Sequence, residues 1–154
     1  MSWLVLAAVC LVMQRLFGLP GIPSFCGLVV LPMVLLVAPA MRSTEEHRIW
    51  RALLLGLAWD VTLEPVVGPG GIFWTASAVV LHGLASVLAD RGPRAWAVCG
   101  AVAAVVLLVA RQLALAPLGL GTPLDWLDVA LSAVLTGAWC GAVGGILALD
   151  LLSR

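Results

Sequence analysis

The segment Ala52–Gly71, with the sequence ALLLGLAWDVTLEPVVGPGG, decides how the rest of the chain is interpreted. It begins as an apolar helix and places Asp60 and Glu64 four residues apart, on one helical face. Pro65 and the run Gly68-Pro69-Gly70-Gly71 then break the chain before the next apolar segment. A carboxylate in a membrane helix costs about 2.5–3.5 kcal/mol at the bilayer centre and less toward the interface. We therefore expect these acidic groups to face protein, water or a partner.

The composition is that of a membrane protein. Of the 154 residues, 63% are hydrophobic and 10% are charged, and the mean hydropathy is +1.15, whereas soluble domains carry about 25% charged residues. A membrane-spanning helix takes about 20 residues, so residues 1–154 form a single transmembrane domain of about six helices with no soluble domain. The net charge is zero and there is no basic cluster, which argues against nucleic-acid binding.

Apolar runs and the turns between them predict an all-α, polytopic fold. The expected spans cover approximately residues 3–19, 25–41, 49–63, 72–89, 95–116 and 124–152. The second run is interrupted by Pro32 and Pro39, and the segment 42–48 is the only strongly polar loop. The N-terminus lacks the positive region of a secretory signal, so the first run is interpreted as a retained span.

The arginines predict the orientation. All eight basic residues are arginine, and those in the connections fall in the second and fourth turns and at the C-terminus. With six spans these places share one membrane face with the N-terminus, so the positive-inside rule places both termini in the cytoplasm. Six tryptophans are expected at span ends and would form two interfacial belts: Trp3, Trp50 and Trp96 at the cytoplasmic ends, and Trp59, Trp74 and Trp126 at the outer ends.

Charged residues gather in the outer half of this topology. They are Asp60, Glu64, Asp125 and Asp128, together with Arg15 and Arg111 within spans. Unpaired charges there are costly, so we expect Arg111 to reach one of the carboxylates. A structural cluster, a ligand or proton site, and a contact with a partner protein all remain open, and Arg15 and Asp125 are close enough to the interface to reach it directly.

Other residues that could carry chemistry have structural interpretations. His82 lies near the middle of the fourth span, where a buried histidine bonded to one neighbour is favoured over a proton relay. The four cysteines are scattered through apolar runs without metal-ligand spacing. No nucleophile–base motif such as GxSxG or HExxH occurs. The sequence therefore predicts no catalytic residue, no metal and no cofactor.

The last span contains small residues every four positions, at Ala133, Gly137, Gly141 and Gly145. Such a stripe allows another helix backbone to approach closely. A helix of the same chain is favoured over a separate subunit. The Gly68 turn follows no strand, so it does not match a phosphate-binding loop.

The sequence resembles the bacterial rod shape-determining protein MreD family. The resemblance lies in a glycine-containing helix that ends in an aspartate, Gly56-Leu57-Ala58-Trp59-Asp60, followed by Pro65, Gly68 and the span from Ile72. Over nearly the whole chain, the length and the hydropathy pattern are also loosely similar to those of the family. Glu64 and the doubled Gly70-Gly71 depart from the family pattern.

The resemblance implies a non-enzymatic subunit of the machinery that elongates the lateral bacterial cell wall, the elongasome, in the cytoplasmic (inner) membrane. Its implied partners are an MreC-like single-span protein and, with it, a SEDS glycosyltransferase, a transpeptidase and the cytoskeletal MreB. The fold is expected to be like that of the substrate-binding subunits of energy-coupling-factor vitamin transporters. In this interpretation the Asp60 turn holds an outward-facing hollow or ridge, against which the transmembrane helix of the partner docks.

Two alternatives remain. The chain could be a substrate-binding subunit of an energy-coupling-factor vitamin transporter, with the outer polar cluster as its ligand site. Those subunits dock on their partner through an Ala-x3-Ala pattern in the first helix, whereas here Ala7 and Ala8 are followed by Leu11 and Val12. The second alternative, an intramembrane enzyme, lacks a nucleophile–base pair.

Overall fold

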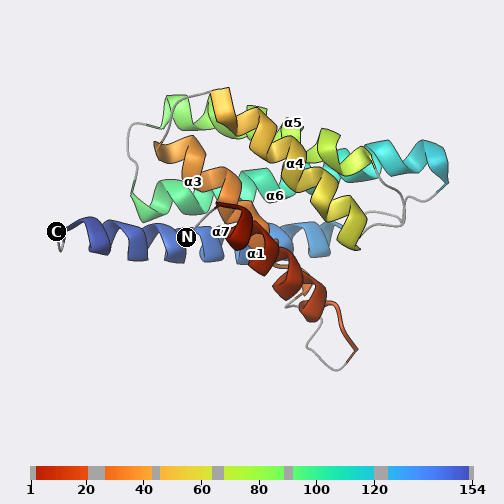
Figure 1. The fold of residues 1–154 in the computed structure, drawn as a ribbon, viewed down its shortest axis with the longest axis horizontal. Coiled ribbons are helices and arrows are strands. Elements are labelled where there is room, and N and C mark those ends of the chain that lie inside the picture. The colour runs from red at the N-terminus through yellow and green to blue at the C-terminus, as the bar shows by residue number, and fades with distance from the viewer. Residues whose placement is uncertain are drawn as a thin grey trace.

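The computed structural model describes residues 3–20, 27–42, 46–63, 68–88, 92–119 and 125–152, and within these ranges the chain is helical, with no strand. The elements are α1 (Trp3–Phe17), η1 (Leu31–Met33), α3 (Val34–Arg42), α4 (Glu46–Leu63), α5 (Pro69–Val87), α6 (Pro93–Leu115), η2 (Ala116–Leu118) and α7 (Trp126–Leu152). The prediction of an all-helical chain is confirmed for these residues (Figure 1).

Three helices are long and apolar enough to cross a membrane: Pro69–Val87, Pro93–Leu115 and Trp126–Leu147. The segments Trp3–Phe17 and Leu31–Met41 are shorter apolar helices. Helix α4 has the length of a span, but Asp60 and the charged residues of its first turns lower its hydropathy. By length and composition, therefore, three of the six predicted spans qualify among the described residues.

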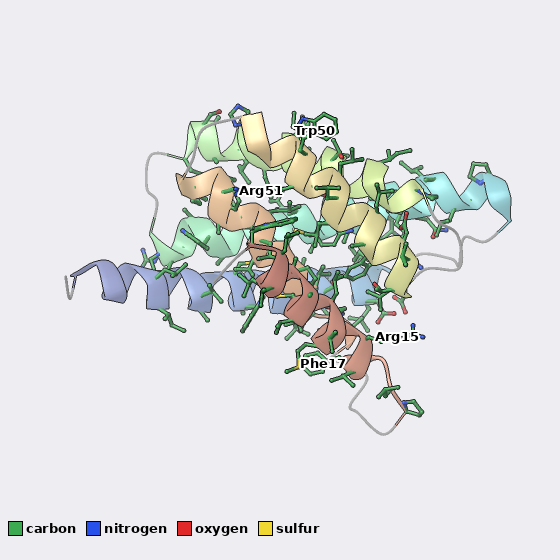
Figure 2. All side chains as sticks on the ribbon, viewed as in Figure 1. Arg15, Phe17, Trp50 and Arg51 are labelled. Carbon is green, nitrogen blue, oxygen red and sulfur yellow. The ribbon has the colours of Figure 1, made fainter. Side chains whose placement is uncertain are left out.

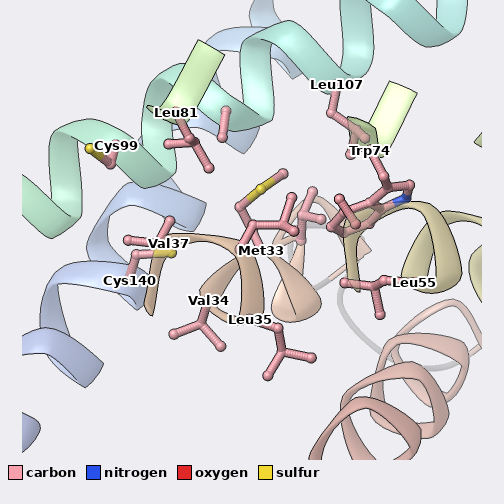
Figure 3. Packing of buried hydrophobic residues seen from close by; sticks show 14 of the residues in the cluster. Met33, Val34, Leu35, Val37, Leu55, Trp74, Leu81, Cys99, Leu107 and Cys140 are labelled. Carbon is pink, nitrogen blue, oxygen red and sulfur yellow. The ribbon is translucent and has the colours of Figure 1, made fainter. Parts of the chain in front are cut away.

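Helix pairing follows the chain order. The most extensive contacts join α6 to α7, then α4 to α5 and α5 to α6, and α1 crosses the bundle at an angle in Figure 1. The short helix α3 contacts α4, α5, α6 and α7. Its fully buried Val37 lies near Cys140 in Figure 3, and Met33, just before α3, belongs to the same buried core cluster as Leu55, Trp74 and Leu81. The smallest apolar helix thus forms the centre of the core.

The second predicted span, expected to be interrupted by Pro32 and Pro39, is not a continuous helix among the described residues. Gly27 is helical, Leu28–Val30 forms a turn, a bend and irregular backbone, and η1 begins at Leu31. Pro32 lies in η1 at the start of the helical part, and Pro39 lies inside α3. Because proline has no N–H to donate, Pro32 fits the first turn of η1, where that donor would have no helical partner.

Side chains of α1 and α7 bind the backbone of this broken segment. The Gln14 carbonyl oxygen accepts a hydrogen bond from the Leu31 N–H at 2.9 Å, and the Thr136 hydroxyl accepts one from the Val30 N–H at 3.0 Å. Ser132 donates to the Leu28 carbonyl at 2.7 Å. In addition, the Trp139 indole N–H donates to the Leu31 carbonyl at 3.2 Å. Irregular backbone inside a membrane needs such partners, so these bonds account for the buried polar residues of α1 and α7.

The predicted tryptophan belts are only partly present. Trp50 and Trp126 are exposed, but Trp74 and Trp96 are buried in the core and cannot serve as interfacial residues. Trp74 is buried because the tightly packed face of α5 that starts at Gly70 and Gly71 continues through it. At the other end of the bundle, the Arg51 guanidinium lies over the Trp3 ring, 5.9 Å from its centroid (Figure 2).

Candidate functional site: the Asp60 cap and the adjoining cavity

Asp60 caps the helix that follows it. Its side chain is fully buried, and its Oδ2 accepts hydrogen bonds from the N–H groups of Gly68 at 2.7 Å and Gly70 at 2.9 Å. Gly68 is the N-cap residue of α5 and has no side chain with which to cap, and Pro69 follows at the first helical position. The carboxylate of α4 therefore replaces the missing cap of α5 and lies at the positive end of its dipole.

Glycine at position 68 is required by the backbone. Gly68 has φ of +126°, which side-chain-bearing residues rarely adopt. This conformation turns the Gly68 N–H toward α4, where Asp60 accepts it. The turn and the carboxylate thus depend on each other.

The two helices of this hairpin touch through glycine. A Cβ on Gly56 would lie 2.5 Å from the carbonyl oxygen of Gly70 and 2.8 Å from the Cα of Gly71. A Cβ on Gly70 would collide with Oδ1 of Asp60. Because these neighbours are largely backbone, α4 and α5 can approach to this distance only where side chains are absent.

The residues singled out by the sequence thus form one contact, but with different partners from those expected. Asp60 faces protein, and its partners are backbone amides rather than an arginine. Gly56 and Gly68 belong to the same contact, and Gly70, an apparent departure from the family pattern, is central to it. Glu64 and Pro65 lie outside the described residues. Oδ1 of Asp60 is buried and has no hydrogen-bond partner among the residues that the structure describes.

A cavity of about 400 Å³ adjoins this hairpin. It lies among the C-terminal parts of α1, α4 and α6, the first turns of α5 and α7, and residues 27–30. Part of its wall is apolar and aromatic, formed by Leu63, Leu107, Leu108, Trp59, Phe73 and Trp74. The remaining side chains are largely polar: Gln14, Arg111, Gln112, Asp125, Asp128 and Ser132. Trp59 and Trp74 pack together with ring centroids 5.3 Å apart.

The charges predicted for the outer half meet at this cavity in part. Arg111, Asp125 and Asp128 all line it. Asp125 also caps α7, because its Oδ1 accepts a hydrogen bond from the Leu127 N–H at 2.9 Å. That Arg111 pairs with one of these carboxylates stays a prediction. Arg15 is exposed in the last turn of α1 and does not line the cavity (Figure 2).

The interpretation of His82 as a buried histidine is wrong. His82 is exposed on α5, because the buried face of this helix runs through Phe73, Ser77 and Leu81, and the next residue is rotated about 100° away from that face. The buried polar residue of α5 is Ser77, whose hydroxyl has no hydrogen-bond partner among the described residues.

The small-residue stripe of α7 packs against α6 of the same chain. A Cβ on Gly137 would lie 2.8 Å from the Ala97 carbonyl oxygen, and one on Gly141 would lie 3.0 Å from the Ala97 Cβ. Gly145 makes only ordinary contacts, with 3.8 Å to the nearest atom. Gly144 does not belong to the four-residue spacing, but it is packed more closely than Gly145. A Cβ on Gly144 would lie 2.6 Å from the Trp96 ring.

Sequence reasoning missed the polar residues that hold the broken segment, Gln14, Ser132 and Thr136. The sequence does contain an indication of their role. Each is an uncharged hydrogen-bonding side chain in a largely apolar run, and such a residue in a membrane helix implies a partner. Among the described residues, no group of three histidine, cysteine, aspartate or glutamate side chains could hold a metal ion.

Comparisons with known proteins do not identify a family. No family model matches the chain, and no similar protein was found among curated proteins or solved structures. The function is therefore argued from the Asp60 cap, the cavity and the sequence.

Proposed function

We propose that the chain is a non-enzymatic, six-span subunit of the bacterial lateral cell-wall elongation machinery that binds an MreC-like single-span partner in the inner membrane. The observation that carries the proposal is the Asp60 cap. Gly56, Asp60 and Gly68, which belong to the stretch that carries the MreD resemblance, all lie where α4 meets the start of α5: Asp60 accepts the Gly68 N–H, and Gly56 lies against Gly70. A motif that builds one contact is better support for a family than similar length and hydropathy.

The proposed topology places both termini in the cytoplasm and the Asp60 turn at the outer face. The distribution of arginines supports this orientation. The helix bounds support it as well, since α1, α4, α5, α6 and α7 each begin and end within a few residues of a predicted span. On this topology the cavity opens toward the outer half of the membrane, on the side where an MreC-like protein has its soluble domain.

The α4–α5 hairpin is the part of the chain best suited to receive a partner helix. Its two helices are fixed by glycine contacts and by the Asp60 cap, so little conformational entropy is lost on docking. Val61 and Ile72, next to the cap on α4 and α5, are 71% and 67% exposed. Since van der Waals packing drives helix association in lipid, we propose that the partner's transmembrane helix packs over these two side chains.

Co-purification with the MreC-like protein encoded in the same genome tests the proposal. Asp60→Ala removes the cap, and Val61→Trp places a bulky side chain on the proposed docking surface without changing the cap. Both are expected to reduce the recovered partner at least several-fold while membrane insertion stays intact. Val87→Trp, at an 80% exposed position at the far end of α5, is the matched control and should not affect recovery. Full recovery with both test variants would overturn the proposal.

A transporter substrate-binding subunit is the second candidate, favoured by the cavity, whose size falls within the roughly 300–1,000 Å³ typical of small-ligand sites. Against it, Ala7 and Leu11 of α1 are buried within the chain, so this face of the first helix is not free to dock on a second subunit. Co-purification with an ATPase-coupled membrane subunit instead of an MreC-like protein would favour this candidate.

A further inference from the structure

We propose that the cavity beside the Asp60 cap binds an amphipathic ammonium compound: a positively charged nitrogen and an oxygen acceptor on an apolar body. The inference does not depend on the partner-binding role, because the cavity residues and the exposed hairpin residues Val61 and Ile72 are different sets. The size of the site, about 400 Å³, admits a small ligand or the polar end of a larger one.

Some of the polar groups around the cavity are already used by the fold. Gln14 binds the Leu31 N–H, and Ser132 donates to the Leu28 carbonyl. These side chains hold the broken segment in place and form the wall. Asp125 also accepts the Leu127 N–H through Oδ1. Ligand recognition is therefore assigned to the net charge of the lining and to the buried N–H of Trp74.

The charged lining favours a cation. Asp125 and Asp128 contribute two negative charges and Arg111 one positive charge, so the described ionisable side chains that line the cavity carry one net negative charge. Both aspartates are exposed at the cavity, and a cleft lined by an excess of one sign of charge between apolar walls attracts ions of the opposite sign. An ammonium group carries that opposite charge, and the nearby rings of Trp59, Phe73 and Trp74 are compatible with it.

Trp74 supplies a second and independent observation. Its side chain is fully buried and lines the cavity, and its indole N–H has no hydrogen-bond partner among the residues that the structure describes. An unsatisfied buried donor costs about 1–3 kcal/mol. An oxygen acceptor carried by the ligand satisfies it, which is why the proposed compound combines an acceptor with the ammonium group.

The same chemistry is available from a free amine or from an aminophospholipid headgroup such as phosphatidylethanolamine. Both carry an ammonium group near oxygen atoms on an apolar body. The site would distinguish them only by how the apolar body leaves the cavity, so experiment must separate them.

Calorimetry on the full chain in lipid nanodiscs tests the charge requirement with three matched probes. They are 2-(benzyloxy)ethylamine, the neutral 2-(benzyloxy)ethanol and the anionic benzyloxyacetate. The amine is expected to bind at least tenfold more tightly than the other two. Equal affinities for the three probes, or no binding of the amine in any lipid, together with no retained aminophospholipid, would overturn the proposal.

Variants connect this preference to the named residues. Asp128→Asn should remove most of the preference for the amine, whereas Asp150→Asn, near the other end of α7, is the matched control and should leave it unchanged. Trp74→Phe should abolish the preference for 2-(benzyloxy)ethylamine over 4-phenylbutylamine, which has a methylene in place of the ether oxygen. Trp50→Phe, at an exposed site on α4, is the control for this pair. A preference that survives both test variants would place the ligand elsewhere and refute the assignment.

Native mass spectrometry and the choice of nanodisc lipid separate the two sources. If the occupant is a lipid, phosphatidylethanolamine is retained on the purified chain in preference to phosphatidylglycerol, and its presence in the nanodisc weakens binding of the amine probe. If it is a free amine, the probe binds equally in both lipids. Partner co-purification is measured separately and should be unchanged in Asp128→Asn, so failure of the ligand site and failure of the partner-binding role give different results.

Discussion

Replacing Gly56 by alanine is expected to open the α4–α5 hairpin. In an isolated helix the change would be favourable by about 1 kcal/mol, because glycine is a poor helix former. In this chain, however, the new Cβ would lie 2.5 Å from the Gly70 carbonyl oxygen and 2.7 Å from its carbonyl carbon. Carbon atoms pack at about 3.5–4.0 Å, so the two helices must move apart by about 1 Å.

The magnitude follows from two costs. Overpacking of this kind destabilises by about 1–3 kcal/mol. A separation of about 1 Å also lengthens the hydrogen bond from Gly70 to Asp60, now 2.9 Å, beyond bonding distance, and a bond to a charged group contributes about 1.5–3 kcal/mol. After the gain in helix propensity, Gly56→Ala should destabilise the chain by about 2–4 kcal/mol.

The measurement is reversible unfolding in mixed detergent micelles, followed by tryptophan fluorescence. Gly83→Ala is the matched control, since Gly83 lies in the interior of α5 and a Cβ there would meet nothing within 4 Å. This variant should be neutral or more stable by up to about 1 kcal/mol. Combining Gly56→Ala with Asp60→Ala should cost less than the sum of the two, because both changes disrupt one contact. Equal stabilities of Gly56→Ala and Gly83→Ala would refute the close contact between α4 and α5.

Three further substitutions test other contacts by the same unfolding assay. Thr136→Val leaves the Val30 N–H without its acceptor and should cost about 1–3 kcal/mol, whereas Thr136→Ser should retain most of the stability; equal losses would show that the hydroxyl does not matter. Asp60→Ala should destabilise by at least about 1 kcal/mol, and Asp60→Asn by less, since asparagine is also a good cap; the reverse order would contradict the capping role. Gly137→Ala should destabilise through its close approach to α6, while Gly145→Ala should be tolerated, and identical stabilities would refute the packing of this stripe.

Helix positions could be predicted from the sequence because the turns are marked by glycine, proline and charge. The Asp60 turn is the clearest case, since its Pro-Gly-Gly sequence ends one apolar run and starts the next. Which side of each helix is buried against the protein could not be predicted in the same way. In a membrane both the lipid-facing and the protein-facing sides are apolar, so hydropathy does not distinguish buried Trp74 from exposed Trp126.

The candidate site was predictable only in outline. The topology brought Asp125, Asp128 and Arg111 to one end of the bundle, and all three line one cavity. The bond between Asp60 and Gly70 was not predictable, because it depends on the close approach of two helices rather than on a charge of opposite sign. The break at residues 28–30 could not be predicted, because an apolar run does not show which backbone groups have partners more than 100 residues away in the sequence.

The hydrogen bonds of that break have a consequence for how the protein is made. Val30 and Leu28 receive their partners from Thr136 and Ser132 of α7, which are synthesised more than 100 residues later. A helix that satisfies its own backbone can enter the lipid as soon as it is synthesised, but this segment cannot. Its backbone groups find these partners only when α7 is in place, so the burial of this segment has to wait until α7 has been synthesised.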